Sequence, residues 1–560
     1  MRKWIPAILA IMIGFALAIV GTTPQSPRSK DVEQAAFSSK RAMEHVRVIA
    51  AEPHPTGSEA NAKVRDYLKS ELEKIGAGVL LPEGVVDDRS LDRFGKWSGK
   101  RPDALTLTNV IGIIPGKVRA KRAVALMAHH DTVYGSPGAP DDTAGVASIL
   151  ETVRAITSQG PTERDIIVVL TDGEELGLLG AKQFVQKNRL ADRVGAIINL
   201  EARGGGGRTT LFQTSKNNGA AIKLYSDAVS RPGGSSLATF IYEILPNDTD
   251  LTPALEREYV AYNLSFIGRP GLYHSPKATS DNLDQGSLQD MGDQTLALTL
   301  ALANAEELPE PAPDRTFFDF FGLFLISYGT IAGWVLLVAT ATIHFFCWRD
   351  DPKGSWAKGL LASASVIVGG GLLLYGLNIL SGSGSGEGIY YDRLAAIPLL
   401  EVQAGLACLA ILAASASLWG GRSASIVGLL IAFVMQLAAP TTAFLVMWPL
   451  LLGGLSALSL RKLNGPIGTS FAVVLGGIVL GMLLQFGHQF MQGVGPDLPS
   501  VTAFLAALAL PVLGALFPVL DRKRAWQFAA VCLVGAFAMA LYVRFDPVAD
   551  TVPVYDSMKG

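Results

Sequence analysis

The chain has 560 residues, of which 17% are charged, with a formal net charge of −2 and a mean hydropathy of +0.33. This length is too great for one ordinary domain, and a charge so close to zero gives no case for a nucleic-acid partner. The only cysteines are Cys347, Cys408 and Cys532. All three lie in or beside hydrophobic segments of the second half, so the first half has no disulfide and cysteine usage does not reveal its compartment.

An apolar run begins the chain. It extends from Trp4 to about Val20, directly after Met1-Arg2-Lys3. Residues 1–24 are therefore predicted to form a transmembrane anchor whose basic flank keeps the N-terminus in the cytoplasm. A cleaved signal peptide is the alternative, because Gly21-Thr22-Thr23 supplies small residues. Either interpretation places the residues that follow outside the cytoplasm.

Residues 30–306 have the composition of one soluble domain, in which strand-like and helix-like segments alternate. Compact apolar runs predict strands at 123–128, 165–170, 194–200 and 210–213, and helical spacing predicts helices at 145–156, 179–186 and 220–229. This alternation predicts an α/β fold with a mainly parallel sheet sandwiched by helices on both faces. In such folds the loops at the carboxyl ends of the strands line the functional site.

Histidines and carboxylates gather in five short pieces of sequence, each at the end of an apolar, strand-like run. The pieces are Ala128-His129-His130-Asp131, Pro140-Asp141-Asp142, Asp172-Gly173-Glu174-Glu175, Asn199-Leu200-Glu201 and Tyr273-His274-Ser275. Two histidines and several carboxylates form the ligand mixture that Zn²⁺ accepts. The sequence therefore predicts a zinc site at this edge of the sheet.

The five pieces supply enough ligands for two zinc ions per chain. A dinuclear site needs one carboxylate that bridges two cations about 3.5 to 4 Å apart, and Asp141 is predicted to have this role. His129 and Glu201 are predicted to hold one ion, and Glu175 and His274 the other.

Two further carboxylates have predicted catalytic roles. Asp131 is two residues from His129 and is placed to accept the second N–H of that imidazole, which would fix its tautomer. Glu174 lies beside a predicted ligand and is the expected general base for a metal-activated water. Their neighbours have simpler explanations: Asp142 is expected to cap the helix that follows, and His130, on the other side of its strand, is expected to pack structurally.

The motifs His129-x-Asp131, Asp141-Asp142, Glu174-Glu175-x-Gly177-Leu178-x-Gly180, Asn199-Leu200-Glu201 and Tyr273-His274 together resemble those of the M28 family of zinc aminopeptidases. The resemblance covers about residues 45–305 and includes the opening Glu52-Pro53-His54-Pro55-Thr56-Gly57-Ser58. It implies a zinc aminopeptidase-like fold, two zinc ions, Glu174 as the base, and five ligands: His129, Asp141, Glu175, Glu201 and His274. Many relatives have Asp where Glu201 stands.

The order of the segments resembles one branch of that family. An anchor, an outward domain and a multi-span region are typical of the endoplasmic reticulum metallopeptidase and vacuolar membrane protease branch. The pieces Asn247-Asp248-Thr249-Asp250 and Ser280-Asp281-Asn282-Leu283-Asp284 also resemble it.

Three prolines mark the end of the soluble domain. Pro309, Pro311 and Pro313 forbid a continuous helix, so residues 307–316 are predicted to form a linker. Residues 317–546 are predicted to form an all-α polytopic transmembrane domain. Its eight predicted spans lie near 317–346, 360–380, 395–419, 426–439, 440–460, 467–490, 500–520 and 528–545, and the anchor makes nine.

Charged loops indicate the orientation of these spans. Counted from the outside, the cytoplasmic loops are those that hold Lys353, Arg422, Arg461 and Arg522, as the positive-inside bias requires. The loop with Glu387 and the tail 547–560 fall outside. The assignment requires 426–460 to be two short passes that turn near Ala439-Pro440 rather than one tilted helix. The protein is thus expected to be a multi-pass membrane protein with an extracytoplasmic peptidase domain.

Glu401 is the one acidic residue well within a predicted span. Such residues are usually functional, yet Glu401 can also lie only two turns from the membrane surface, and both interpretations stay open. His344 and His488 lie near the ends of spans, where interfacial placement is expected.

Three functions are compatible with the sequence. The first is an exopeptidase that removes N-terminal residues from peptides with a metal-activated water. The second is a non-catalytic transporter or scaffold with a peptidase-like domain, and the third is a single-zinc glutaminyl cyclase or an amidohydrolase. The intact ligand set favours the first. Peptides and the lipid bilayer are the expected partners, and the sequence makes no prediction of an oligomeric state.

Overall fold

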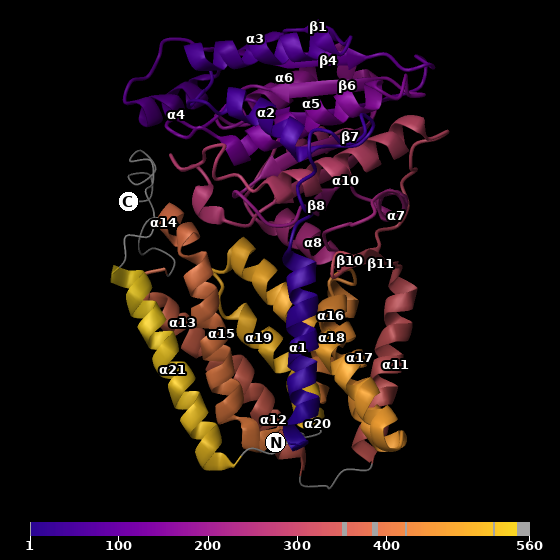
Figure 1. The fold of residues 1–560 in the computed structure, drawn as a ribbon, viewed down its shortest axis with the longest axis vertical. Coiled ribbons are helices and arrows are strands. Elements are labelled where there is room, and N and C mark those ends of the chain that lie inside the picture. Colours follow the sequence, from indigo (N-terminus) through magenta and orange to yellow (C-terminus); the bar gives the residue numbers. More distant parts are fainter. Residues whose placement is uncertain (1, 350–354, 384–389, 420–422, 519–520, 546–560) are drawn as a thin grey trace. The chain divides into compact units, whose positions relative to one another are not determined.

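The structure is a computed structural model that describes residues 2–349, 355–383, 390–419, 423–518 and 521–545 (Figure 1). The chain divides into two compact units. The α/β unit comprises Thr23–Asp319 and Leu323–Ser327. The helical unit comprises the residues before Thr23 and, apart from Leu323–Ser327, those from Phe320 to the last described residue.

A seven-stranded sheet forms the centre of the α/β unit, with the strand order β1-β4-β6-β5-β7-β9-β8. The four strands β6, β5, β7 and β9 are parallel, whereas β1, β4 and β8 are antiparallel to their neighbours. The strands are β1 (Gly78–Leu80), β4 (Val110–Ile114), β5 (Ala123–His129), β6 (Ile166–Thr171), β7 (Val194–Ala202), β8 (Thr210–Thr214) and β9 (Val260–Phe266). The predicted mainly parallel sheet is confirmed.

Alternate side chains of the central strands pack on opposite faces of this sheet. In β5, Val124 and Leu126 belong to one core, shared with α2 (Ser39–Ile49), α5 (Ala144–Thr157) and α10 (Gln285–Asn304). Ala125 and Met127 belong to a second core, shared with α6 (Leu179–Lys187) and α9 (Leu251–Ala254). Because successive side chains of a strand alternate between faces, a strand covered on both sides is apolar throughout. Helices on both faces were predicted, and the α/β fold class is confirmed.

The remaining elements of the α/β unit surround this sandwich. They are α3 (Glu59–Lys74), α4 (Asp88–Ser98), α7 (Gly219–Ala228), α8 (Ser236–Ile244) and the small antiparallel pair of β2 (Glu83–Val85) and β3 (Thr106–Thr108). Asp284 caps α10 by accepting a hydrogen bond from the backbone N–H of Ser287 at 2.9 Å, the interaction expected of an N-cap aspartate.

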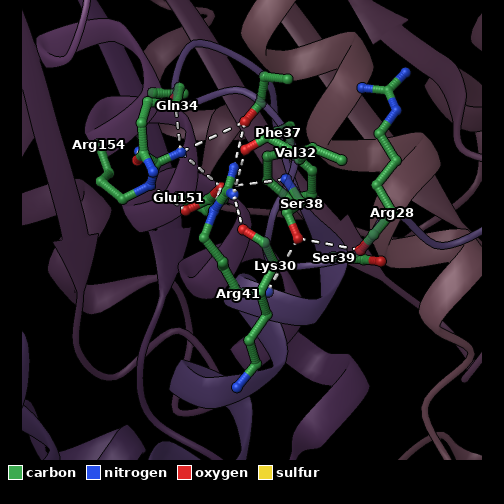
Figure 2. A network of polar contacts seen from close by, with 12 residues as sticks. Arg28, Lys30, Val32, Gln34, Phe37, Ser38, Ser39, Arg41, Glu151 and Arg154 are labelled. Carbon is green, nitrogen blue, oxygen red and sulfur yellow. Dashed lines mark hydrogen bonds and ion pairs between the residues drawn. The ribbon is translucent and has the colours of Figure 1, made fainter.

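Glu151 is fully buried in α5 and is neutralised by two arginines. Its carboxylate accepts hydrogen bonds from Arg41 Nε at 2.8 Å, from Arg154 Nε at 2.6 Å and from the backbone N–H of Ser38 at 3.1 Å (Figure 2). The two arginines also donate to backbone carbonyls of Lys30, Val32, Gln34 and Ala36. A buried charge persists only when it is paired and hydrogen-bonded. Residues 25–38, termed the N-terminal strap, are thereby fastened across α5.

Seven helices in the described part of the helical unit are long and apolar enough to cross a membrane. They are α1 (Ile5–Thr22), α11 (Thr330–Arg349), the continuous helix Trp356–Leu380, α15 (Ile397–Ala414), α17 (Phe444–Lys462), α18 (Gly465–Val494) and α21 (Arg522–Phe545). Two shorter apolar helices lie at the other two predicted spans, namely α16 (Ser423–Ala438) and Val501–Leu516. The chain is an integral membrane protein.

Two predicted spans need correction. The span predicted at 317–346 begins only at Thr330, because β10 (Thr316–Phe320) and β11 (Phe324–Tyr328) form a two-stranded hairpin before it. Phe321 and Gly322 make its turn with φ of 53° and 66°, a left-handed backbone that reverses the chain and that a helix does not contain. The span predicted at 500–520 is interrupted between α19 (Val501–Leu508) and α20 (Leu510–Leu516), where Pro511 lacks the N–H that a continuous helix needs.

Residues 426–460 contain parts of two helices, as the prediction of two passes requires. Helix α16 ends at Ala438 and α17 begins at Phe444, with a turn between them. Several of the loop and tail segments used to predict the orientation of the spans lie outside the described residues: Lys353, Glu387, Arg422 and the tail 547–560.

Helix α1 packs against α18 at very short range. A Cβ atom added to Gly14 would lie 3.1 Å from the backbone nitrogen of Gly481 and 3.2 Å from the carbonyl oxygen of Gly477. One added to Gly477 would lie 2.7 Å from Cβ of Ile13. Small residues are what allow the backbones of two membrane helices to approach this closely. This fit favours a retained anchor, since loss of residues 1–22 would uncover the glycine face of α18.

We expect Gly477→Leu to destabilise the helical unit by about 1–3 kcal/mol, because the new side chain has to displace α1. Gly405→Leu is the matched control: no atom outside its own helix lies within 4 Å of a Cβ at Gly405, and leucine is the better helix former. Thermal unfolding of both variants in detergent gives the comparison. Equal stability of the two variants, or an intact mass that lacks the first 22 residues, would contradict the proposed packing of α1.

Candidate metal centre

Four neighbouring parallel strands bring the predicted ligands to one edge of the sheet. His129 is the last residue of β5, Glu174 and Glu175 follow the end of β6 at Thr171, and Glu201 is the penultimate residue of β7. Asp141 lies in the irregular turn Ala139–Thr143 that precedes α5, and His274 lies in the loop after β9. The carboxyl ends of adjacent parallel strands meet at one edge, and so these distant segments converge.

Asp141 lies between the two predicted histidine ligands. Its Oδ1 is 3.1 Å from Nε2 of His129, and its Oδ2 is 3.3 Å from Nε2 of His274. Glu175 Oε1 lies 3.2 Å from the same nitrogen of His274. Each oxygen of one carboxylate therefore faces a different imidazole, which is the arrangement that a bridging carboxylate requires.

The five residues form two overlapping groups that share Asp141. One group is His129, Asp141 and Glu201, and the other is Asp141, Glu175 and His274; within each group the potential ligand atoms lie within 4.8 Å of one another. The partition is the same as that predicted from the sequence. A third group of His129, Glu174 and Glu175 also meets this limit, so Glu174 lies beside the ligands as a general base would.

The donor set fits zinc. Zn²⁺ binds nitrogen and carboxylate oxygen at about 2.0–2.1 Å in tetrahedral geometry, so two ligand atoms of one ion are about 3.3 Å apart. The three separations at Asp141 and His274 are close to this value. Glu201 adds a second observation, because its Oε1 is buried without a hydrogen-bond partner among the described residues. A buried carboxylate oxygen without a donor requires compensation, which a cation supplies.

Asp131 acts differently from the prediction. The Nδ1 of His129 lies 2.9 Å from the backbone carbonyl of Asp131 and 3.7 Å from its carboxylate. The carbonyl is therefore the group that accepts the imidazole N–H and sets the tautomer. The carboxylate accepts instead from the backbone N–H groups of Glu174 at 3.0 Å and Glu175 at 3.3 Å. Asp131 thus shapes the loop that carries the predicted base, while its own backbone orients His129.

The pKa values of the acidic groups of the centre are shifted in opposite directions. Burial opposes the ionisation of Asp141, yet its hydrogen bonds with His129 and His274 outweigh burial and lower its pKa to about 2. Burial favours neutral His129, but Asp131 and Asp141 raise its pKa well above the ordinary value. The same carboxylates that attract a proton to this imidazole also attract a metal cation. Burial raises the pKa of Glu174 well above the ordinary value, which suits a group that takes up and releases a proton.

The neighbours of the ligands have structural roles, as predicted. Asp142 Oδ1 accepts a hydrogen bond from the backbone N–H of Gly145 at 3.1 Å, which caps the start of α5. His130 is buried on the other side of β5, where its Nε2 lies 3.1 Å from the carbonyl of Thr108. His54 is held by the carbonyl of Glu52 at 2.9 Å, and burial lowers the pKa of its imidazole to about 4.

The backbone of His274 is strained. Its φ is 51°, in the left-handed region that a residue other than glycine adopts at a cost of about 1–3 kcal/mol. The imidazole stacks on the ring of Tyr273 at 3.8 Å between centroids. A strained conformation of this kind persists where surrounding contacts hold it, and here it turns the imidazole toward Asp141 and Glu175.

Asp250 is a further neighbour of the centre, and the sequence pattern does not predict it as a site residue. It is fully buried, accepts a hydrogen bond from Thr171 at the end of β6, and its Oδ1 has no hydrogen-bond partner in the described part of the chain. Burial raises its pKa to about 6. The signal for it in the sequence is the piece Asn247-Asp248-Thr249-Asp250, which resembles the membrane protease branch of the family.

Residues 109–299 match the family model described as peptidase family M28, and this range contains all five predicted ligands and Glu174. Endoplasmic reticulum metallopeptidase 1 of Homo sapiens is 29% identical over 360 residues, which is 60% of this chain and 39% of that protein. Vacuolar membrane protease of Lachancea thermotolerans is 28% identical over 298 residues, which is 50% of this chain and 30% of that protein. The matched part is therefore well under two thirds of either relative. The resemblance stated from the motifs is confirmed.

Solved structures also match part of this chain. A glutaminyl cyclase of Fimbriiglobus ruber has a TM-score of 0.39 and 19% identity and covers 49% of this chain and 99% of its own. A zinc aminopeptidase of Bacillus subtilis has a TM-score of 0.39 and 15% identity and covers 52% of this chain and 99% of its own.

Proposed function

We propose, from the match of residues 109–299 to the model of peptidase family M28, that the protein is a membrane-bound di-zinc exopeptidase that removes N-terminal residues from peptides. The observation that carries the proposal is the placement of Asp141, whose two carboxylate oxygens face His129 and His274. In a site for one ion, the second carboxylate oxygen of Asp141 would not need to face another histidine.

The proposed ligands divide between the two ions. His129 and Glu201 would hold one, Glu175 and His274 the other, and Asp141 would contact both. When bound, the zinc ions would supply Lewis-acid polarisation of the scissile carbonyl and would acidify water.

Glu174 is the proposed general base and acid. It accepts a proton from the attacking water and then passes that proton to the leaving amine. The backbone N–H of Glu174 is held by the Asp131 carboxylate at 3.0 Å, which fixes the loop without occupying the Glu174 side chain. A carboxylate of the site also suits recognition of the free N-terminal ammonium of a peptide, since the two groups have opposite charges. This charge complementarity supports an exopeptidase that removes residues from the N-terminus of its substrate.

The peptidase domain is proposed to lie on the extracytoplasmic side of the membrane, in the periplasm, outside the cell or in a lumen. The basic residues before α1 and those at Arg461 and Arg522 support this orientation through the positive-inside bias.

The test uses the full chain in detergent with zinc and two matched peptides, one with a free N-terminus and one acetylated. We expect free amino acids to be released from the first peptide only, and to cease when a chelator removes the metal. Equal cleavage of both peptides would retain a hydrolase but overturn the aminopeptidase assignment. Cyclisation of an N-terminal glutaminyl peptide without hydrolysis would favour the glutaminyl cyclase alternative, and no turnover with full zinc content would favour the non-catalytic one.

A further inference from the structure

A polar cluster joins two helices of the helical unit. Glu401 lies on α15, and His488 and Gln492 lie one turn apart on α18. Glu401 Oε2 is 3.0 Å from His488 Nδ1, and Glu401 Oε1 accepts a hydrogen bond from Gln492 Nε2 at 2.6 Å. Both helices are candidate membrane spans. His488, expected at the membrane interface as an isolated group, is therefore the partner of Glu401.

One end of the cluster is partly exposed, and the other end holds a buried polar atom without a hydrogen-bond partner among the described residues. The side chains of His488 and Glu401 are 39% and 25% exposed, whereas Gln492 is only 6% exposed. The Oε1 atom of Gln492 is buried and has no hydrogen-bond partner among the described residues. A buried oxygen that accepts no hydrogen bond is unfavourable, so this oxygen and the neighbouring carboxylate together favour the presence of a hydrogen-bond donor.

Among the described residues, the charged groups on helices near the cluster are hydrogen-bonded or remote from it. Arg393, on α14 (Tyr390–Ala395), pairs with Asp497 at 2.9 Å. Arg544 of α21 donates to the carbonyl of Leu380 at 3.2 Å. Helices α1, α13 (Gly370–Leu380) and α19 contain no charged residue. The remaining basic groups of the packed helices lie at the opposite ends of α17 and α21: Arg461, Lys462, Arg522, Lys523 and Arg524.

The pair is electrically neutral in one protonation state only. With one shared proton between Glu401 Oε2 and His488 Nδ1, the net charge is zero whichever atom carries it. Loss of that proton leaves a carboxylate, and gain of another leaves an imidazolium, and either charge is costly in a membrane span. Imidazole is also the side chain that exchanges protons near neutral pH. We propose that Glu401 and His488 form a binding site for one exchangeable proton within the membrane-spanning helices, with Gln492 as the residue that orients the carboxyl group.

The proposal is tested with the full chain in lipid nanodiscs by pH-difference infrared spectroscopy between about pH 5 and 8. The carbonyl stretch of a protonated carboxyl group is resolved from the bands of carboxylates. The buried carboxyl groups of the α/β unit, such as Asp250, contribute bands of their own. We expect one further titrating band in the wild type that is absent in Glu401→Gln, which keeps the side-chain volume. In His488→Gln we expect the band to remain but its midpoint to move, because the two groups of the wild type share one proton.

Asp521→Asn is the matched control, because Asp521 is an exposed carboxylate of the helical unit outside the spans; its spectrum should keep the titrating band. Carboxyl bands of the α/β unit persist in every variant and report that the chain is folded, as does peptide hydrolysis. A spectrum of Glu401→Gln identical to that of the wild type would overturn the proposal. So would a midpoint that His488→Gln leaves unchanged, and this second variant decides the matter if Glu401→Gln does not fold.

Discussion

Glu174→Gln is expected to lower kcat by a factor of about 10²–10⁴, the usual contribution of a general base, with two zinc ions still bound. Glutamine has the same shape and keeps the backbone N–H that donates to Asp131 at 3.0 Å, but it does not accept a proton from water. Steady-state kinetics on an N-free peptide, with zinc measured by mass spectrometry on the same sample, gives both quantities.

Glu256→Gln serves as the control for this experiment, since Glu256 is an exposed carboxylate of the same unit; it should match the wild type in rate and metal content. If Glu174→Gln loses zinc, then Glu174 is a ligand rather than the base. If it retains full activity, another group accepts the proton.

Asp141→Asn is expected to lose at least one zinc ion and to reduce turnover at least about 100-fold. Removal of a group that only supports a ligand already costs 10- to 100-fold in metal affinity or activity, and Asp141 directly faces both histidines. An amide presents one oxygen and one N–H₂ group, so one of the two proposed ions would face a donor instead of an acceptor. Zinc content after dialysis, and protection against thermal unfolding on zinc addition, are the measurements.

The exposed Asp103 provides the matched substitution Asp103→Asn, which should keep both ions and the wild-type rate. Retention of two tightly bound zinc ions by Asp141→Asn would show that the bridging role is misassigned, and the dinuclear proposal would then fail even if the chain proves to be a hydrolase.

The mainly parallel sheet and the position of several ligands at one of its edges could be predicted because both follow from short-range patterns. Apolar runs such as Ala123–His129 identify strands covered on both faces, and each predicted ligand comes at or soon after such a run. Since parallel strands align their carboxyl ends, His129, Glu175 and Glu201 could be placed together without coordinates. His274 was grouped with them through its ligand chemistry and the family resemblance.

Features that depend on backbone conformation or on long-range contacts could not be predicted in the same way. A carboxylate two residues from His129 suggested a side-chain contact, but the closer acceptor is the carbonyl of Asp131, and carbonyl direction is not encoded in residue type. The apolar residues of 316–328 concealed a hairpin, because aromatic side chains suit strands and membrane helices alike. The pair of Glu401 and His488 required knowledge that α15 and α18 are neighbours.

The contacts of the N-terminal strap indicate at which residue a fragment of the α/β unit should begin. Gln25 and Arg28 bond to Asp290 and Asp293 of α10, and Arg41 needs the carbonyls of the strap to hold its guanidinium beside Glu151. A fragment that starts at residue 39 would remove the strap carbonyls that accept from Arg41, and a buried donor left without an acceptor costs about 1–3 kcal/mol. Crystallisation trials of the α/β unit should therefore use a fragment that begins near residue 23, although the match to the family model begins only at residue 109.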